Sequence, residues 1–185
     1  ESALDTYGEI NDWDVSLITD MSSLFSSKTT FNDDISSWDV SSVTNMYKMF
    51  HYAQDFNQDL TLWDVSNVTN MASMFQMALD FNGDISTWDV SSVTNMMGMF
   101  ENSNPPNLAN WVFAPGCNVE NMFRNSQNFT GEGLSTWDVS NLTSMYQLFR
   151  TSAQNQGGNC GDCSFNSDLS SWDVANVTDM GEMFQ

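Results

Sequence analysis

The chain has 185 residues, of which 41% are hydrophobic, so it is long enough for one globular domain or one repeat array with a packed interior. It carries 24 acidic residues against four Lys and Arg, and its formal net charge is −20. Such a surface repels DNA, RNA and anionic membranes, because clustered Lys and Arg are needed to bind phosphate, so we expect no nucleic-acid partner and no membrane insertion.

Seven copies of a unit of roughly 25 residues follow one another along the chain. Each is marked by a Trp at position 13, 38, 63, 88, 111, 137 or 172, and a Phe stands 12 residues after every one of them. The intervals between copies are 25, 25, 25, 23, 26 and 35 residues. Because the offset is constant while the interval varies, insertions fall outside a conserved core segment of the unit.

Each unit combines a strand-like part with a turn-like part. In the second copy the step of two from Trp38 to Val40 is strand spacing, in which alternate side chains face the same side. From Val43 the apolar residues follow at steps of three to Met46 and Met49, which predicts a bend and then a short helical or 3-10 turn.

One such unit cannot bury its apolar side alone, whereas stacked copies can, each strand pairing in parallel with the next at about 4.8 Å. The sequence therefore predicts one right-handed repeat solenoid over 1–185, built from short parallel strands and short helical or 3-10 turns. The 13 methionines fall largely on stacked apolar positions, where Met fills irregular gaps beside aromatic rings. An irregular copy at 101–124 predicts a local bend or loop, and a Cys-containing insertion occupies 153–164.

The pattern Ile-x-x-Trp-x-Val-x-x-Val-Thr-x-Met-x-x-Met-Phe resembles the repeat of BspA-type leucine-rich-repeat surface proteins, which occur on bacterial, mycoplasmal and some protist cells. The resemblance covers nearly the whole chain, and six of the seven copies keep Trp-Asp-Val. It implies a leucine-rich-repeat-like solenoid that is exported and takes part in adhesion or in binding to a host or matrix. It implies no catalytic residues. The fifth copy departs from the pattern, since Trp111 is followed by Val and Phe.

An Asp follows the Trp in six copies and forms a polar column, whose first members are Asp14, Asp39, Asp64 and Asp89. In register these carboxylates lie about 5 Å apart. Like charges at that spacing repel by about 1 kcal/mol or more per neighbour. Either turn hydrogen bonds to nearby N–H and hydroxyl groups or a bound cation has to offset this repulsion.

Calcium is the one cofactor that the sequence leaves open. Two segments place oxygen-bearing side chains at alternate positions, as a Ca²⁺ loop does. These residues are Asp55, Asn57 and Asp59, and Asp80, Asn82 and Asp84. Neither segment continues with the Gly and distal Glu of an EF-hand, and both recur with the repeat, so a purely structural role is the competing interpretation.

A second polar column consists of Thr19, Thr44, Thr69 and Thr94. A flat Thr array can bind ice or a polysaccharide, but ice-binding solenoids usually present paired Thr columns. Here each Thr follows an apolar residue and precedes the turn. That position favours a capping role, in which Thr or Ser hydroxyls satisfy the first N–H groups of the Met-Phe turn.

The chain has three cysteines, Cys117, Cys160 and Cys163. The last two form a Cys-x-x-Cys in the insertion, without the βαβ context of a redox motif. A zinc site needs a further Cys or His, and the single histidine, His51, lies about four coils away. If the chain is secreted, a Cys160–Cys163 disulfide is the favoured interpretation, and pairing of Cys117 with one of them is the alternative.

Asn-x-Thr sequons begin at four asparagines, which become glycosylation candidates in a eukaryotic secreted protein: Asn67, Asn128, Asn141 and Asn176. Three of these arise from the repeat consensus, so repetition alone accounts for them. Asn128 is the more independent candidate.

No catalytic constellation is apparent, because the chain has one His, lacks a Gly-rich phosphate loop, and places its carboxylates in repeat columns. We therefore expect no enzyme activity. Two functions remain. The first is an extracellular or cell-surface module for adhesion or for binding a protein or glycan on a cell surface or matrix. The second is a structural subunit of an extracellular filament or coat, which self-associates through its solenoid ends or packs laterally.

Overall fold

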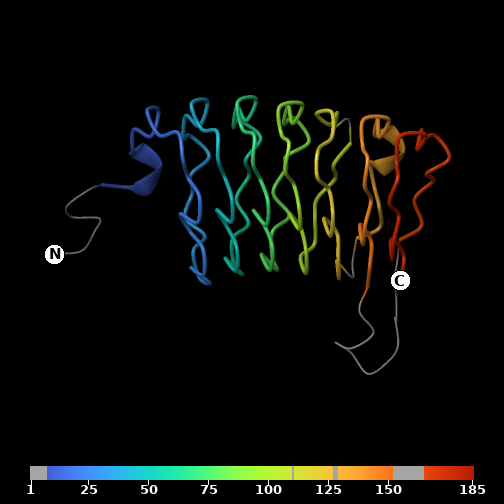
Figure 1. The fold of residues 1–185 in the computed structure, drawn as a ribbon. Coiled ribbons are helices and arrows are strands. Elements are labelled where there is room, and N and C mark those ends of the chain that lie inside the picture. The colour runs from blue at the N-terminus through green and yellow to red at the C-terminus, as the bar shows by residue number, and fades with distance from the viewer. Residues whose placement is uncertain (1–7, 110, 127–128, 152–164) are drawn as a thin grey trace, which may run out of the picture.

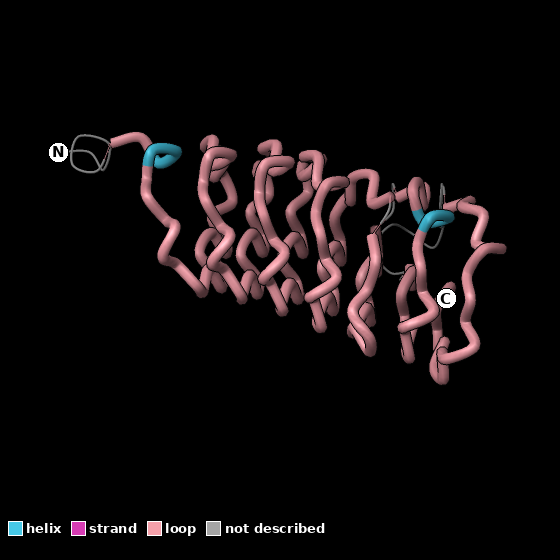
Figure 2. Tube along the Cα trace, turned by 90° about the horizontal axis from the view of Figure 1, so that it is seen from above, coloured by secondary structure: helices cyan, strands magenta, loops and turns pink. Residues whose placement is uncertain are grey.

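The computed structural model describes residues 8–109, 111–126, 129–151 and 165–185. Copies of the repeat lie side by side in chain order, with the first and the last at opposite ends of the row (Figure 1). Seen from above, the chain makes one circuit in each copy before it passes to the next (Figure 2). The helices of the described residues are two short 3-10 helices, η1 (Ile10–Asp12) and η2 (Leu134–Thr136), and neither is long enough to cross a membrane.

Backbone hydrogen bonds join neighbouring copies in register. The N–H of Met46 donates to the carbonyl of Asn70 at 2.9 Å, and the N–H of Lys48 donates to the carbonyl of Ala72 at 3.0 Å. Alternate N–H groups repeat this pattern in every neighbouring pair of copies. Single parallel bridges run through Asp20, Asn45, Asn70, Asn95 and Asn118. In the described part of the chain, parallel pairing thus occurs as isolated bridges, most of them around Asn45 and its counterparts rather than at the Trp-x-Val segments where the spacing predicts short strands.

The Met-Phe segments are successive tight turns. In the second copy the N–H of Met49 donates to the carbonyl of Met46 at 3.1 Å, and the N–H of Ala53 donates to the carbonyl of Phe50 at 3.0 Å. Lys48 has a φ of 55°, in the left-handed region that type II turns use at their third residue. Turns therefore replace the short helical or 3-10 turn predicted here, because a helix cannot continue through a left-handed residue.

Columns of Trp, Val, Met and Phe fill the interior, and the burial predicted for them from the spacing is confirmed. In the second copy Val43, Met46, Met49 and Phe50 are 0% exposed. The Phe column runs through the whole stack, with neighbouring ring centroids 5.4–6.0 Å apart and nearly parallel rings. Full burial of each such side chain contributes about 1.5–3 kcal/mol, so stacked copies stabilise one another.

The copy at 101–124 stays within the stack, and its Trp111 stacks on the Trp of the following copy. Trp63 stacks on Trp88, and Trp111 stacks on Trp137, each pair at 6.4 Å between ring centroids. The indole N–H of Trp88 donates to a carbonyl of the preceding copy at 3.0 Å, as most of the tryptophans do. That of Trp111 is buried and has no partner among the described residues. After the 23-residue interval the copy therefore lacks the indole hydrogen bond at Trp111, while the Phe column stays continuous.

Candidate functional site

The Asp column is hydrogen-bonded to the backbone of its own copy. A carboxylate oxygen of Asp39 accepts the N–H of Ser41 at 3.0 Å and its hydroxyl at 2.6 Å. The same turn occurs at Asp14, Asp64, Asp89, Asp138 and Asp173. The side-chain and backbone hydrogen bonds from Ser41 lower the pKa of Asp39, although the neighbouring carboxylates of the column oppose that shift. Local hydrogen bonds thus outweigh the repulsion along the column.

The calcium candidates take part in two hydrogen-bond systems. Asp59 and Asp84 accept N–H groups two residues ahead, at 2.9 and 2.8 Å. Asn57 accepts the N–H of Asn82 in the next copy at 2.7 Å. The N–H groups of Asp55 and Asp80 donate to carbonyls of the preceding copy, both at 3.0 Å. No three His, Cys, Asp or Glu side chains within the described ranges gather closely enough to hold a metal ion.

The Thr column faces the preceding copy. The hydroxyl of Thr44 donates to the carbonyl of Thr19 at 3.2 Å, and Thr69, Thr94 and Thr178 repeat this contact. Thr therefore does not take the predicted capping role, whereas Ser does so in the sixth copy, where the hydroxyl oxygen of Ser144 accepts the N–H of Tyr146 at 3.3 Å. In the second copy the residue after Thr44 performs it, since the side-chain oxygen of Asn45 accepts the N–H of Tyr47 at 3.1 Å.

Two of the cysteines and one of the sequon asparagines lie outside the described residues: Cys160, Cys163 and Asn128. Cys117 is a buried free cysteine, and burial raises the pKa of its thiol to about 12. Asn67, Asn141 and Asn176 are all exposed, and the side-chain amides of Asn67 and Asn176 donate to carbonyls of the preceding copy at 2.8 Å.

The side of the stack that carries the Met-Phe turns bears basic and aromatic residues, unlike the Asp and Thr columns. We call it the turn face; it comprises the outward residues of 21–28, 46–54, 71–79, 96–103, 119–126, 145–151 and 180–185. All four Lys and Arg of the chain, its one His and three of its four Tyr lie in these segments: Lys28, Tyr47, Lys48, His51, Tyr52, Arg124, Tyr146 and Arg150. Their identities vary from copy to copy, whereas the Asp and Thr columns repeat.

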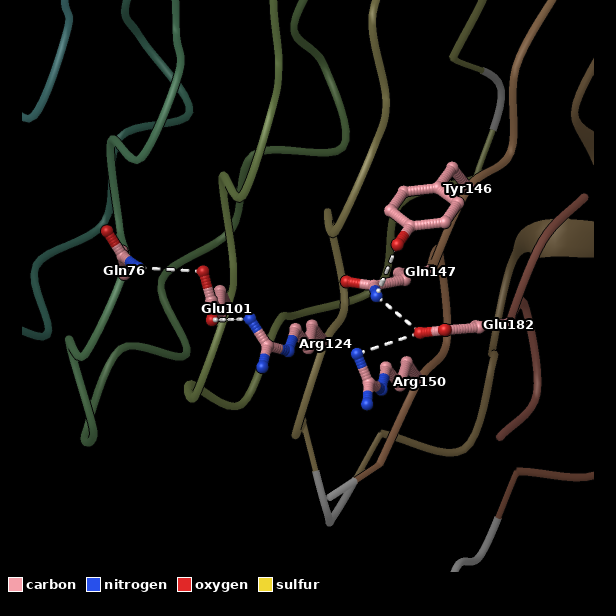
Figure 3. A network of polar contacts seen from close by, with 7 residues as sticks. All are labelled: Gln76, Glu101, Arg124, Tyr146, Gln147, Arg150 and Glu182. Atoms are coloured by element: carbon pink, nitrogen blue, oxygen red, sulfur yellow. Dashed lines mark hydrogen bonds and ion pairs between the residues drawn. The ribbon is translucent and has the colours of Figure 1, made fainter. Parts of the chain in front are cut away.

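In the later copies the cations of the turn face are paired. Figure 3 shows Glu101 between Gln76 and Arg124, at 2.8 and 3.3 Å. Glu182 accepts bonds from Arg150 at 2.8 Å and from the adjacent Gln147 at 2.5 Å. Burial raises the pKa of Glu101, and Arg124 and Gln76 oppose that effect. This part of the face is therefore nearly neutral.

The second copy carries a contiguous group that we call the cation-aromatic patch: Tyr47, Lys48, His51 and Tyr52. The Lys48 Nζ lies 5.2 Å from the centroid of the Tyr47 ring. The His51 and Tyr52 rings meet edge to face at 4.6 Å. Burial, and then the nearby Lys48 charge, lower the pKa of His51. Tyr47 and Tyr52 are 37% and 40% exposed, so the patch presents both aromatic and cationic groups to solvent.

The turn face was not singled out in the sequence because no single residue recurs on it. The sequence signal that identifies the turn face is variation of a position from copy to copy. Between and just after the constant Met and Phe, the outward positions vary among the copies, and these positions collect the rare Lys, Arg, His and Tyr.

The sequence matches the model of the family described as "Mycoplasma protein of unknown function, DUF285" over residues 2–111 and again over 102–185. No curated protein and no solved structure is significantly similar to the chain. The two matched ranges together contain every Trp and Phe of the stacked columns. The chain therefore belongs to the DUF285 family.

Proposed function

We propose that this chain is a non-enzymatic, extracellular or cell-surface module that binds a protein or glycan of a cell surface or matrix through its turn face. In this proposal the row of copies is a right-handed, leucine-rich-repeat-like solenoid, as the resemblance to BspA-type adhesion proteins implies. The observation that carries the proposal is the concentration of every Lys, Arg and His on one side of a chain with net charge −20.

Physical arguments favour the turn face over the polar columns. Tyr and Arg are enriched where proteins bind partners, because they combine a large contact area with hydrogen-bonding groups. The carboxylates of the Asp column are occupied by their own turns, and the Thr hydroxyls by the preceding copy. A surface of constant stacked turns with variable side chains also suits a protein whose interior must repeat while its exterior selects a partner.

Binding of the purified chain to cells or extracellular matrix tests the proposal. The double variant Tyr47→Ala/Tyr52→Ala removes aromatic area from the turn face, and we expect it to bind several-fold more weakly. The matched control Asp39→Asn/Asp64→Asn alters two exposed acidic residues of the Asp column, outside the turn face. Asn keeps a side-chain oxygen that can accept the N–H group of each turn. Equal binding by wild type and the aromatic variant, with loss in the control, contradicts the proposal.

A structural subunit is the second candidate, favoured by the exposed apolar side of the copy at 165–185. Phe184 is 61% exposed and Met180 42%, whereas their counterparts Phe75 and Met71 are buried at 0%. In this candidate function, another molecule of the same repeat packs on this side. Light scattering over a wide concentration range tests this candidate: growth of the particle that Phe184→Ser abolishes supports assembly, and a constant monomer mass contradicts it.

A further inference from the structure

The cation-aromatic patch differs in charge from the surface around it. Segments 21–28 and 46–54 contain Lys28, Lys48 and His51 and no Asp or Glu. No carboxylate of the described residues lies within salt-bridge distance of Lys48, since the ion pairs there are Arg124–Glu101 and Arg150–Glu182. A partly exposed, unneutralised cation beside two exposed aromatic rings is complementary to an anionic group carried on a flat, partly apolar body.

We propose that the cation-aromatic patch binds the terminal, carboxylate-bearing sugar of a glycan, an assignment that rests on the proposed function. The Lys48 ammonium pairs with the sugar carboxylate. The Tyr52 ring packs against the C–H face of the sugar, because the electron-rich face of an aromatic ring attracts polarised C–H groups. Tyr47, which already lies beside the Lys48 ammonium, holds that cation over the patch.

The charge of the whole molecule restricts the anion to a single terminal group. Asp residues recur in every regular copy, so a long polyanion lying along the stack would meet carboxylates beyond the patch. At physiological ionic strength electrostatic interactions are screened over about 8 Å. A single carboxylate at the end of a neutral chain can therefore reach Lys48 while the rest of the ligand feels little of the acidic surface.

The backbone of the patch favours a sugar over an acidic peptide. The N–H groups of Lys48 and Tyr52 donate to the following copy, at 3.0 and 2.9 Å. The carbonyls of Tyr47 and His51 accept N–H groups of the preceding copy, at 2.8 and 2.7 Å. A peptide strand that adds to a sheet needs free backbone groups of this kind. Here they are used within the stack, so a ligand has to be recognised by side chains alone.

Calorimetric titration with two oligosaccharides tests the assignment: one ended by a uronic acid, the other its carboxyl-reduced form. We expect the acid form to bind and its reduction to weaken binding about fivefold, the ratio that an exposed ion pair at the upper end of its usual range gives. Lys48→Gln removes the difference between the two forms, and Tyr52→Ala weakens binding of both. Tyr146→Ala is the positional control for the patch, because Tyr146 occupies in the sixth copy the place that Tyr47 has in the second.

Equal binding of the acid and reduced forms overturns the assignment, and so does a Lys48→Gln variant that still distinguishes them. If neither oligosaccharide binds while the protein still attaches to matrix through the turn face, the glycan assignment fails and the proposed function stands. If the patch binds an acidic peptide instead, the assignment is equally overturned. Failure of the proposed function shows separately, as matrix binding that no turn-face substitution changes.

Discussion

Truncation of Phe75 to Ala tests how strongly the copies depend on one another. The Phe75 ring is 0% exposed, and its centroid lies 5.4 Å from that of Phe50, 5.6 Å from Phe100 and 3.9 Å from Phe81. Its removal therefore opens a cavity shared by three consecutive copies. Buried Phe→Ala substitutions cost about 3–5 kcal/mol, and the tight stacking places this one at the upper end of that range.

Phe184→Ala is the matched control, because it removes the same side chain from the same column where the ring is 61% exposed. It loses a stacked contact with Phe149 at 5.4 Å and a tilted contact with Phe165 at 6.0 Å, each worth about 0.5–1.5 kcal/mol. Urea unfolding followed by tryptophan fluorescence measures both losses in the free energy of unfolding. A loss at Phe75 no larger than that at Phe184 refutes the idea that the shared aromatic interior holds the copies together.

Three further predictions concern individual polar groups. Trp88→Phe breaks a 3.0 Å hydrogen bond and should cost about 1 kcal/mol more of unfolding free energy than Trp111→Phe, whose indole N–H has no described partner; an equal cost contradicts this. In a Cys160→Ser/Cys163→Ser background, the buried Cys117 thiol should react with a thiol reagent only after unfolding; fast reaction of the native protein contradicts the raised pKa. Turn hydrogen bonds hold the pKa of nine aspartates below 3.8 in the folded chain. The stabilisation that these carboxylates contribute is therefore complete well above pH 3.8 and is lost as the pH falls through their pKa values in the folded state. A urea midpoint that does not fall on acidification below about pH 4 contradicts this prediction.

The interior of this protein is predictable from sequence because repetition averages out local ambiguity. One Val-x-x-Met-x-x-Met-Phe segment alone fits a helix or a turn. Seven copies with Trp and Phe at a constant offset identify the positions that must share an interior, and Val43, Met46 and Phe50 are indeed buried. In the last copy the corresponding Met180 is 42% exposed, because no described residue packs on the side of that copy away from the stack.

The backbone of the turns was not predictable in the same way. Left-handed φ angles usually call for Gly or Asn, yet Ser23, Lys48 and Ser73 adopt them here. Only Gly98 and Asn121 in that column give a sequence signal. The hydrogen bonds to the neighbouring copies impose this conformation on the other residues, so tertiary contacts override local preference.

The candidate site was missed for a related reason. Attention to constant columns leads to Asp and Thr, which the structure shows to be engaged in turns and inter-copy contacts. Tyr47 and Tyr52 are brought beside Lys48 and His51 by two consecutive tight turns. That arrangement depends on the unexpected backbone geometry and therefore could not follow from residue spacing.

The backbone hydrogen bonds between copies point along the row rather than across it, and this gives the protein a defined response to mechanical load. A pull on its two ends opens those bonds one copy at a time, as a zipper opens, instead of shearing many at once. Each detached copy of about 25 residues releases roughly 80 Å of extended chain. We therefore expect a pulled chain to lengthen in steps of about that size.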